Sequence, residues 1–327
     1  AKVQAPPESH YITHFPKHPL CTICNNCKMQ KAQHRASKHK SGEHGEEAIK
    51  PDKIGDSATA DHIIMGKGEI SASGDAVAFI CWDRFHKWLG TYPDKTNDTE
   101  CTKVACNKFF GKTHPQLVYT DDYTSLNKAM RELGYPHDTS TPHKPESNGV
   151  AERAVRKAKE GTACQIMQSG LHAVWWHWAM PCFAFLYNVT EKCLLRDGEW
   201  KTPYESMFSD IFLKQDIIPF GAEEEWKPSN PSYIKEQHKF GTKLRSGLFF
   251  GYHSHQGGKW SGDFYIADWE QLLNATHPNN VYPARVKRKE VEIIKLSSGR
   301  FRFPVGEGAL IPAYVEVIGT DPNTPFK

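Results

Sequence analysis

The chain has 327 residues, of which 39% are hydrophobic and 12% aromatic, which is enough to form packed cores in two or three domains. Its net charge of +3 is too small to indicate a polyanionic partner by itself. An odd number of cysteines, nine, with no signal peptide before them, argues against a disulfide scaffold and favours a reducing intracellular compartment. Because residue 1 is Ala rather than Met, we expect a piece of a longer polypeptide.

Histidines and cysteines are concentrated near the N-terminus. Six of them fall within eighteen positions: His10, His14, His18, Cys21, Cys24 and Cys27. A Cys-x-x-Cys turn can place two thiolates on one ion, and a His-x-x-x-His spacing puts two imidazoles on one face of a helical turn. We expect a tetrahedral Zn²⁺ site made by His10, His14, Cys21 and Cys24, with His18 and Cys27 as alternative ligands. The competing interpretation is a His/Cys-rich tail without metal, because few apolar residues surround these ligands.

Residues 36–55 are rich in Lys, Glu, Gly, Ser and His and show no periodicity, so they are predicted to be a linker. The sequence beyond it changes to apolar runs of strand length. We therefore predict a zinc-binding segment at 1–35, the linker at 36–55, a mixed α/β core at 56–210, and a β-rich region with a basic tail at 211–327.

Strands and helices are predicted in a mixed order within this core. Strands are expected at 59–65, 76–82, more weakly at 87–92, and at 116–120 and 137–141. Helices are expected at 98–110, with Asp98 as N-cap, and at 125–133, ended by Gly134.

The segment SNGVAERAVRKAKEGTACQIMQSG predicts a helix over about 150–168, with Ser147 or Asn148 as its N-cap. Glu152, Arg156 and Lys159 are related by i, i+4 and i+7, so they share one face. The apolar face toward the core is predicted from Val155, Ala158, Ile166 and Met167. An ordinary amphipathic surface helix with internal ion pairs is the alternative.

The most apolar stretch, 173–189, is shorter than the about 20 residues needed to span a bilayer and contains His177, Pro181 and Asn188. We predict a buried helix and no membrane association. Farther on, apolar and polar residues alternate between Gly-containing turns, which is typical of a small antiparallel barrel or sheet.

Three acidic residues carry the chemistry. Asp61 and Asp121 lie near the ends of apolar strands, and Glu152 opens a helix. A fold that gathers them would create carboxylate repulsion that hard cations such as Mg²⁺ relieve. Two such ions stabilise the attacking and leaving oxygens of a phosphoryl displacement, so phosphodiester chemistry is the leading hypothesis.

Basic residues form two runs on either side of this core. The first comprises Lys28, Lys31, Arg35, Lys38 and Lys40, and the second comprises Arg285, Lys287, Arg288, Lys289, Lys295, Arg300 and Arg302. Each run by itself is equally consistent with a solvated surface. Flanking a phosphoryl-transfer core, they favour contacts to a nucleic-acid backbone.

The motifs DHI at Asp61, YTDD at Asp121 and TPHKPESNGVAER around Glu152, preceded by a His/Cys segment, resemble the integrase region of copia-type retrotransposon polyproteins. NG-VAER is the most specific of them. The resemblance extends over nearly the whole chain, through WHWAMPCFAFLYNV and KTPYESMF to the β-rich region. Asp122 stands where the family usually has Asn, and six residues between His14 and Cys21 make the zinc segment compressed.

The resemblance implies an RNase H-like core in which Asp61, Asp121 and Glu152 bind two Mg²⁺ or Mn²⁺ ions and catalyse the trimming of element ends and their strand transfer into target DNA. It also implies DNA contacts by Arg156 and Lys159, and by Lys144 beside a flexible loop at 143–149. A homo-oligomer assembled in the cytoplasm and acting in the nucleus is expected. A decayed nucleic-acid-binding relic and a hydrolytic nuclease of the same fold are the alternatives.

Overall fold

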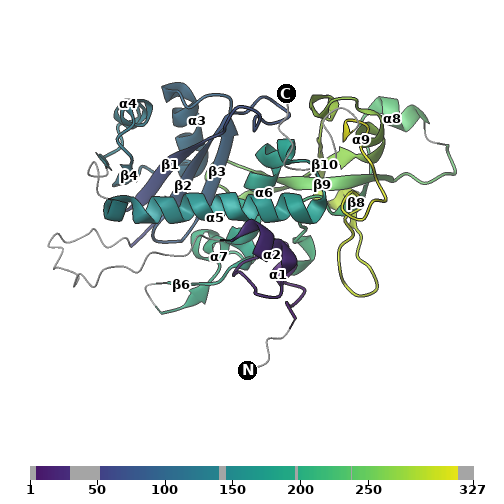
Figure 1. Cartoon of the computed structure of the whole chain (residues 1–327), viewed down its shortest axis with the longest axis horizontal. Coiled ribbons are helices and arrows are strands. Elements are labelled where there is room, and N and C mark those ends of the chain that lie inside the picture. The colour runs from purple at the N-terminus through teal and green to yellow at the C-terminus, as the bar shows by residue number, and fades with distance from the viewer. Residues whose placement is uncertain (1–4, 30–51, 140–144, 196–197, 237, 316–327) are drawn as a thin grey trace.

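The computed structural model describes residues 5–29, 52–139, 145–195, 198–236 and 238–315 (Figure 1). The first of its two large sheets contains β1 (Ala58–Ile64), β2 (Val77–Asp83), β3 (Leu89–Asp94), β4 (Val118–Thr120) and β5 (His137–Thr139). The strand order is β3-β2-β1-β4-β5. β2 is antiparallel to both β1 and β3, whereas β4 is parallel to both β1 and β5. The expected mixed sheet is confirmed.

Helices cover both faces of this sheet (Figure 1). On one face, Phe79 of β2 packs in a cluster with residues of α3 (Thr99–Phe110) and α4 (Thr124–Leu133). On the other face, Ile80 of β2 lies in a cluster with α5 (Pro145–Ser169) and α6 (Trp176–Thr190). Successive residues of one strand therefore serve different helical layers, as the pleat requires.

Local sequence signals account for the ends of the shorter helices. Asp98 caps α3 as predicted, since its carboxylate accepts a hydrogen bond from the N–H of Cys101 at 2.9 Å. Gly134 ends α4 in the left-handed conformation, with φ of 69°. The weak strand predicted at 87–92 begins two residues later, because Lys87 has φ of 59° and belongs to the turn between β2 and β3.

The N-terminal boundary predicted for α5 is wrong. The helix begins at Pro145, so Ser147 and Asn148 lie inside it rather than at its N-cap. A proline is well suited to the first turn because no helical partner exists there for an N–H. The loop predicted at 143–149 is wrong from residue 145 onward for the same reason, and its first two residues lie outside the described part of the chain.

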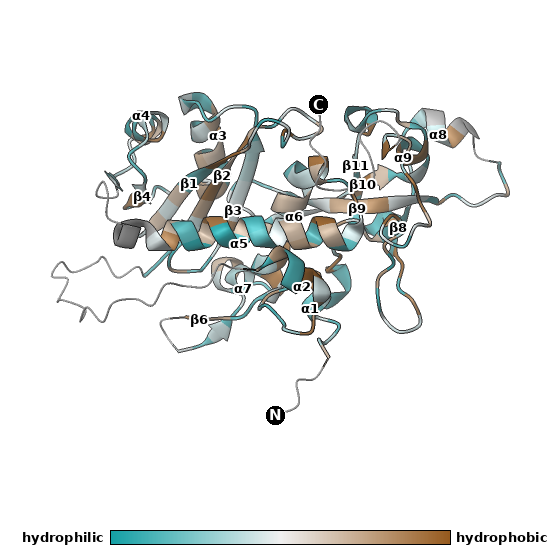
Figure 2. Ribbon diagram, in the orientation of Figure 1, coloured by the Kyte–Doolittle hydropathy of each residue, from teal (hydrophilic) through white to brown (hydrophobic). Residues whose placement is uncertain are grey.

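α5 is amphipathic along its length (Figure 2). Ala158 and Ile166 are buried and Val155 is partly buried, as predicted, but Met167 is 39% exposed. Gly161 marks the closest approach to α6, because an added Cβ would lie 2.1 Å from the ring of Phe183. A glycine in mid-helix costs about 1 kcal/mol relative to alanine, and the packing of this ring explains its presence.

α6 is the buried helix predicted from its composition, and it follows a short 3₁₀ turn, η1 (Ala173–Trp175). Its Asn188 is satisfied within the core: the side-chain oxygen accepts the N–H of Leu89 at 2.9 Å and the amide donates to the Leu89 carbonyl at 2.8 Å. The helix is thereby tied to the start of β3. None of the helices in the described ranges has the length and apolarity needed to cross a membrane.

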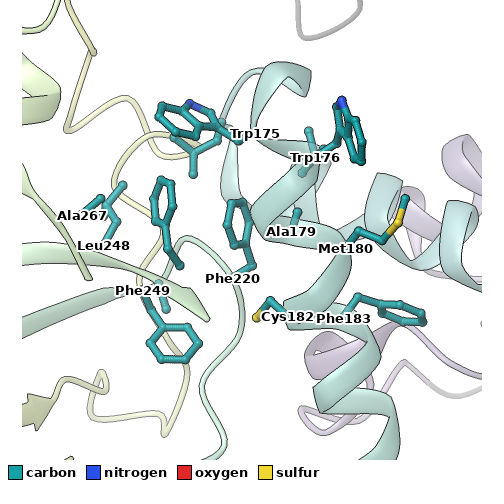
Figure 3. Close-up of a cluster of buried hydrophobic side chains, with 14 of the residues drawn as sticks. Trp175, Trp176, Ala179, Met180, Cys182, Phe183, Phe220, Leu248, Phe249 and Ala267 are labelled. Atoms are coloured by element: carbon teal, nitrogen blue, oxygen red, sulfur yellow. The ribbon is translucent and has the colours of Figure 1, made fainter. Parts of the chain in front are cut away.

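The predicted C-terminal antiparallel sheet is also present. It contains β8 (Glu223–Trp226), β9 (Arg245–Ser254), β10 (Trp260–Asp268), β11 (Ala284–Lys287) and β12 (Val291–Ile293) in the order β11-β10-β9-β8-β12. Phe249 of β9 and Phe220 belong to one buried cluster with Trp175 of η1 and Cys182 of α6 (Figure 3). The two sheets are therefore joined through a shared apolar core on α6.

Smaller elements complete the described chain. They are α1 (His10–Thr13), α2 (Thr22–Cys27), β6 (Cys193–Leu194), β7 (Trp200–Lys201), α7 (Pro203–Phe208), η2 (Lys214–Asp216), α8 (Pro231–Glu236), α9 (Trp269–Asn274), η3 (Pro278–Asn280) and η4 (Arg288–Glu290). α1 and α2 pack against α5 on the side away from the first sheet (Figure 1). Most of the predicted linker at 36–55 lies outside the described residues.

Glu224 of β8 provides a test of the C-terminal core. Its side chain is fully buried, one oxygen accepts the N–H of Ile294 at 3.1 Å, and the other has no partner among the described residues. Burial raises the pKa of this carboxyl from 4.5 to about 9. The folded state therefore keeps a proton that the unfolded chain loses, so the free energy of unfolding should fall as the pH rises from about 4.5 to about 9.

We expect Glu224→Gln to flatten this pH dependence, because an amide cannot ionise. Urea midpoints measured at pH 5 and pH 8 check it, with Glu225→Gln as the matched control on the same strand. An unchanged difference between the two midpoints in Glu224→Gln would contradict the assignment of this group.

Candidate active site and zinc-binding site

Strand pairing brings Asp61 and Asp121 together. β1 and β4 are parallel and in register, with Ala60 opposite Thr120. Asp61 is the next residue of β1 and Asp121 directly follows the last residue of β4, so this register brings the two acids close to each other. The 59 residues between them (62–120) do not affect this relation, because the pairing of β1 with β4 determines it.

Glu152 approaches the same region from α5. The helix packs against β1 and β2, and Glu152 lies in its N-terminal half on an exposed face. Its charge acts on Asp61, as does that of Asp121. The structure thus brings the three predicted acids within range of direct charge repulsion.

The environment of Asp61 favours binding of a cation. Burial, together with the charges of Asp121 and Glu152, raises the pKa of this carboxyl from 3.8 to about 6, while a 2.7 Å hydrogen bond from the N–H of His62 opposes the shift. A positive ion between the acids would relieve both the desolvation and the repulsion. Within the described residues the oxygens of the three acids do not all lie within 4.8 Å of one another. Their roles as metal ligands stay a prediction.

The structure distinguishes Asp121 from its neighbour. Asp122 is exposed, accepts a 2.6 Å hydrogen bond from the side chain of Asn127, and lines an open depression of about 410 Å³ together with Arg131 and His137. Asp121, not Asp122, is the one whose charge acts on Asp61. The geometry therefore favours Asp121 as the member of the triad.

Two residues that sequence analysis missed fix the backbone at Asp121. The hydroxyl of Thr120 donates to the carbonyl of Asp121 at 2.9 Å, so Nε2 of His137 is the donor in its 2.7 Å hydrogen bond with that hydroxyl. This chain of bonds links β5 to the end of β4. Thr120 and His137 carry no motif in the sequence, and only the strand pairing shows their role.

The predicted DNA contacts of α5 lie on its exposed side. Arg156 and Lys159 are both exposed on the helical face that carries Glu152, which agrees with the predicted spacing. Lys144 lies outside the described residues, so its predicted role stays untested. A cation–phosphate contact needs this kind of solvent-facing position beside the acids.

Several residues of the two basic runs contact other groups of the protein itself, rather than extending freely toward a nucleic acid as predicted. Lys28 is buried, with 5% exposure, and its ammonium donates to the carbonyl of His14 at 2.7 Å, so it cannot contact DNA as expected. The other four members of that run lie outside the described residues. In the C-terminal run, four arginines form ion pairs within the protein: Arg285 with Asp263, Arg288 with Asp216, Arg300 with Glu8, and Arg302 with Glu223.

The four predicted zinc ligands form a compact cluster. The donor atoms of His10, His14, Cys21 and Cys24 all lie within 4.8 Å of one another, and all four side chains are buried. The Cys24 sulfur is 3.3 Å from Nε2 of His10, and the Cys21 sulfur is 3.5 Å from Nδ1 of His14. These separations match the edges of about 3.5–3.7 Å expected for a tetrahedron with zinc bonds of about 2.0–2.3 Å.

Protonation and local geometry also suit zinc. Burial lowers the pKa of His10, and lowers that of His14 to about 4, so both imidazoles are neutral at pH 7. Neutral imidazole is the form that coordinates metal. Cys21 is the N-cap of α2, and its sulfur accepts the N–H of Cys24 at 3.5 Å, which forms the tight Cys-x-x-Cys turn.

A further residue, Gln168 of α5, was missed by sequence analysis. Its side-chain oxygen lies 2.8 Å from Nε2 of His14. Because the amide oxygen is an acceptor, this bond places the ring proton on Nε2 and leaves Nδ1, the atom facing the two cysteines, available for metal. Such a partner commonly orients a metal-binding histidine.

The alternative ligands lie outside this cluster. The Cys27 sulfur is 3.6 Å from the sulfur of Met167 and faces α5, while Nδ1 of His18 accepts the N–H of Leu20 at 3.2 Å. Sequence spacing admitted both residues. α2 directs Cys27 toward α5, whereas the ring of His18 meets the ring of His10 edge-on at 5.6 Å but is not among the four residues whose donor atoms cluster.

Comparisons with known proteins agree with the motifs. No model of a known protein family matches the chain. Over 181 residues the chain is 27% identical to the retrovirus-related Pol polyprotein from transposon RE1 of Arabidopsis thaliana, and it is 26% identical to the corresponding polyprotein from transposon RE2 over the same length. The resemblance to retrotransposon Pol polyproteins is confirmed. Each match covers 52% of this chain and 12% of the polyprotein, so the chain spans a small part of these relatives.

Among solved structures, the chain is similar to the catalytic core domain of BIV integrase. The superposition has a TM-score of 0.35 and 16% sequence identity, and it covers 47% of this chain and 95% of that domain.

The zinc cluster predicts a metal content that depends on particular cysteines. We expect the purified protein to contain about one equivalent of zinc, and Cys24→Ser to lose it, because a hydroxyl is a poor replacement for a thiolate ligand. Cys27→Ser, altered on the same short helix, is the matched control and should retain the metal. Elemental analysis measures both, and equal zinc loss in the two variants would contradict this ligand set.

Proposed function

We propose that the chain is the integrase of a retrotransposon, a polynucleotidyl transferase that trims element DNA and joins it to host DNA. The observation that carries this proposal is that the charges of Asp121, directly after β4, and of Glu152, on α5, act on Asp61 of the neighbouring strand β1. The similarity to retrotransposon Pol polyproteins supports the same reading. Carboxylates that repel one another, on β1, directly after β4 and on α5, have an evident use as ligands of divalent cations.

We assign Mg²⁺ or Mn²⁺ binding to the three acids. A pair of these ions, when bound, would supply charge stabilisation for the attacking and leaving oxygens of a phosphodiester. The protein's own contribution is to hold the carboxylates in place. The β1–β4 ladder fixes Asp61 and Asp121, and the packing of α5 on β1 and β2 fixes Glu152.

Arg156 and Lys159 are assigned to the DNA backbone. They follow Glu152 by one and two helical turns on the same exposed face, so a strand bound at the acids would pass over both cations. Such contacts orient the substrate without reading its sequence. Within this proposal, the protein works as a homo-oligomer, is assembled in the cytoplasm and acts in the nucleus, where host DNA is present.

Experiment can distinguish the proposed integrase from two alternative functions. A decayed relic would bind nucleic acid without catalysis, and a hydrolytic nuclease of the same fold would cut DNA without joining it. Joined products on a gel separate an integrase from both. The exposed cationic face of α5 could bind DNA in an integrase, a nuclease or a non-catalytic relic, whereas only the two enzymes require the three acids.

The triad is tested by the substitution Asp61→Asn. We expect the rate of Mg²⁺-dependent strand transfer to fall by about 100-fold or more, because the variant loses a charged ligand while its side chain keeps the same shape. Asp122→Asn is the matched control, since that exposed acid bonds to Asn127 and should be dispensable. Full activity of Asp61→Asn, or equal loss in Asp122→Asn, would refute the assignment.

DNA binding by α5 is tested through its salt dependence. Replacing Arg156 and Lys159 together by alanine should lower the slope of log affinity against log salt by about 0.9 for each lost phosphate contact. Lys112→Ala, which removes an exposed lysine at the end of α3, serves as the control. Fluorescence anisotropy with labelled duplex DNA measures the slope, and an unchanged slope would exclude these two contacts.

A further inference from the structure

Residues 10–28, which we call the N-terminal module, pack against α5 rather than standing apart from it. Gln165 of α5 donates from its amide to the carbonyl of Ile12 at 2.5 Å, and Gln168 donates to the carbonyl of Tyr11 at 2.8 Å. Gln168 also contacts His14 through its oxygen, so both ends of one side chain are used by the module. The α5 helix therefore satisfies backbone groups that the short α1 leaves open.

A second attachment lies about two turns toward the N-terminus of α5, at Lys157. Its ammonium donates to the hydroxyl of Tyr187 at 2.7 Å and lies 4.2 Å and 4.1 Å from the ring centroids of Trp82 and Tyr187. The module supplies a third ring, Phe15, at 5.3 Å. A cation enclosed by aromatic rings is attracted to their faces, the more strongly when water is excluded.

Phe15 joins this group to the rest of the module. The ammonium of the buried Lys28 lies 5.6 Å from the same ring, and the ring meets Tyr187 edge-on at 5.8 Å. Nearby, the hydroxyl of Thr13 donates to the carboxylate of Glu191 at 2.7 Å. The charge of Glu191 also acts on Lys157, so the cation has both rings and an acid around it.

Lys157 carries its charge in a partly buried position, where the loss of water must be compensated by contacts with the protein. Burial lowers the pKa of its amine from 10.5 to about 8, so most molecules at pH 7 still carry the charge there. The other lysine of α5, Lys159, is exposed to solvent. Because Phe15 belongs to the module, Trp82 to β2 and Tyr187 to α6, this one side chain touches every layer that surrounds α5.

We propose that Lys157 and Gln168 fasten the N-terminal module to the helix that carries Glu152, so that zinc binding in the module and the rigidity of α5 are coupled. The coupling rests on the proposed zinc site and goes beyond the proposed catalysis. A small module of this kind folds around its metal, so loss of the metal would release Phe15 and His14 from α5. By linkage, contacts that zinc binding strengthens also strengthen zinc binding, so removing them should lower the zinc affinity. Lys157 and Gln168 are positioning residues, since neither is a metal ligand.

Zinc affinity of the full chain tests the first half of the proposal. We expect Phe15→Ala, Lys157→Ala and Gln168→Ala each to weaken affinity about tenfold, measured by competition with a chromophoric chelator. Gln168→Glu should restore most of it, because a carboxylate still accepts from His14. Lys112→Ala is the control and should bind zinc like the wild type. Phe15→Ala keeps the test valid if Lys157→Ala fails to fold.

Amide hydrogen exchange tests the second half. Chelation of zinc should speed exchange in α5 around residues 157–168 at least fivefold in the wild type and leave β9 unchanged. In Phe15→Ala the same chelation should have a smaller effect, because the link is already weakened. The Phe15→Ala, Lys157→Ala double variant should weaken zinc binding by less than the product of the single effects.

Unchanged zinc affinity in both Phe15→Ala and Gln168→Ala would overturn the proposal, as would α5 exchange that ignores the chelator. A wild type that binds no zinc would overturn both the zinc site and the coupling. Failure of the proposed catalysis gives a different result: strand transfer would be absent while the zinc and exchange effects remained.

Discussion

The structure depends on the packing of α5 against three partners. One side of the helix lies on β1 and β2, a second meets α6 at Gly161, and a third carries the N-terminal module. Isolated helices of ordinary composition are marginal in water, so these contacts supply most of the stability of α5. Glu152 is consequently held by tertiary packing rather than by local helix propensity. Every part of the proposed chemistry depends on that packing.

Buried charge is the second theme of this molecule. Among the described residues no cationic side chain raises or lowers the pKa of Asp61, whereas the partly buried Lys157 is surrounded by aromatic rings and Glu191. The charge of Asp61 would therefore be balanced by a bound cation, whereas the charge of Lys157 is already balanced by groups of the protein. Both are costly to bury, but only the first suggests a binding site. Comparing the two separates a candidate catalytic acid from a structural cation.

Periodicity and capping signals were sufficient to predict most of the fold. The strands and helices of the first sheet follow from alternating runs and from residues such as Asp98 and Gly134, whose roles are local. The start of α5 was missed because Ser147 and Asn148 resemble caps, although Pro145 opens the helix. Local preference gave the wrong boundary because the packed helix extends past it.

The site was predictable only where residue type decides the chemistry. The acids and the zinc ligands have few other uses in such contexts, so their spacing was informative. Gln168, Thr120 and His137 are common residues whose roles arise from neighbours distant in sequence. For Lys28 the residue type was misleading: its basic run predicted contact with a nucleic acid, but the side chain is buried and donates to a backbone carbonyl of the N-terminal module. The pattern of charges along a sequence does not show which lysines and arginines are buried or paired within the folded protein.

The parallel ladder between β1 and β4 has an evolutionary consequence. Adjacency of Asp61 and Asp121 is set by pairing register, so the hairpins and the helix between them can lengthen or shorten while the acids stay neighbours. A shift of one residue inside β4 would instead turn Asp121 to the opposite face. Divergent relatives should therefore vary freely in the connecting loops and hardly at all in the number of residues within these two short strands.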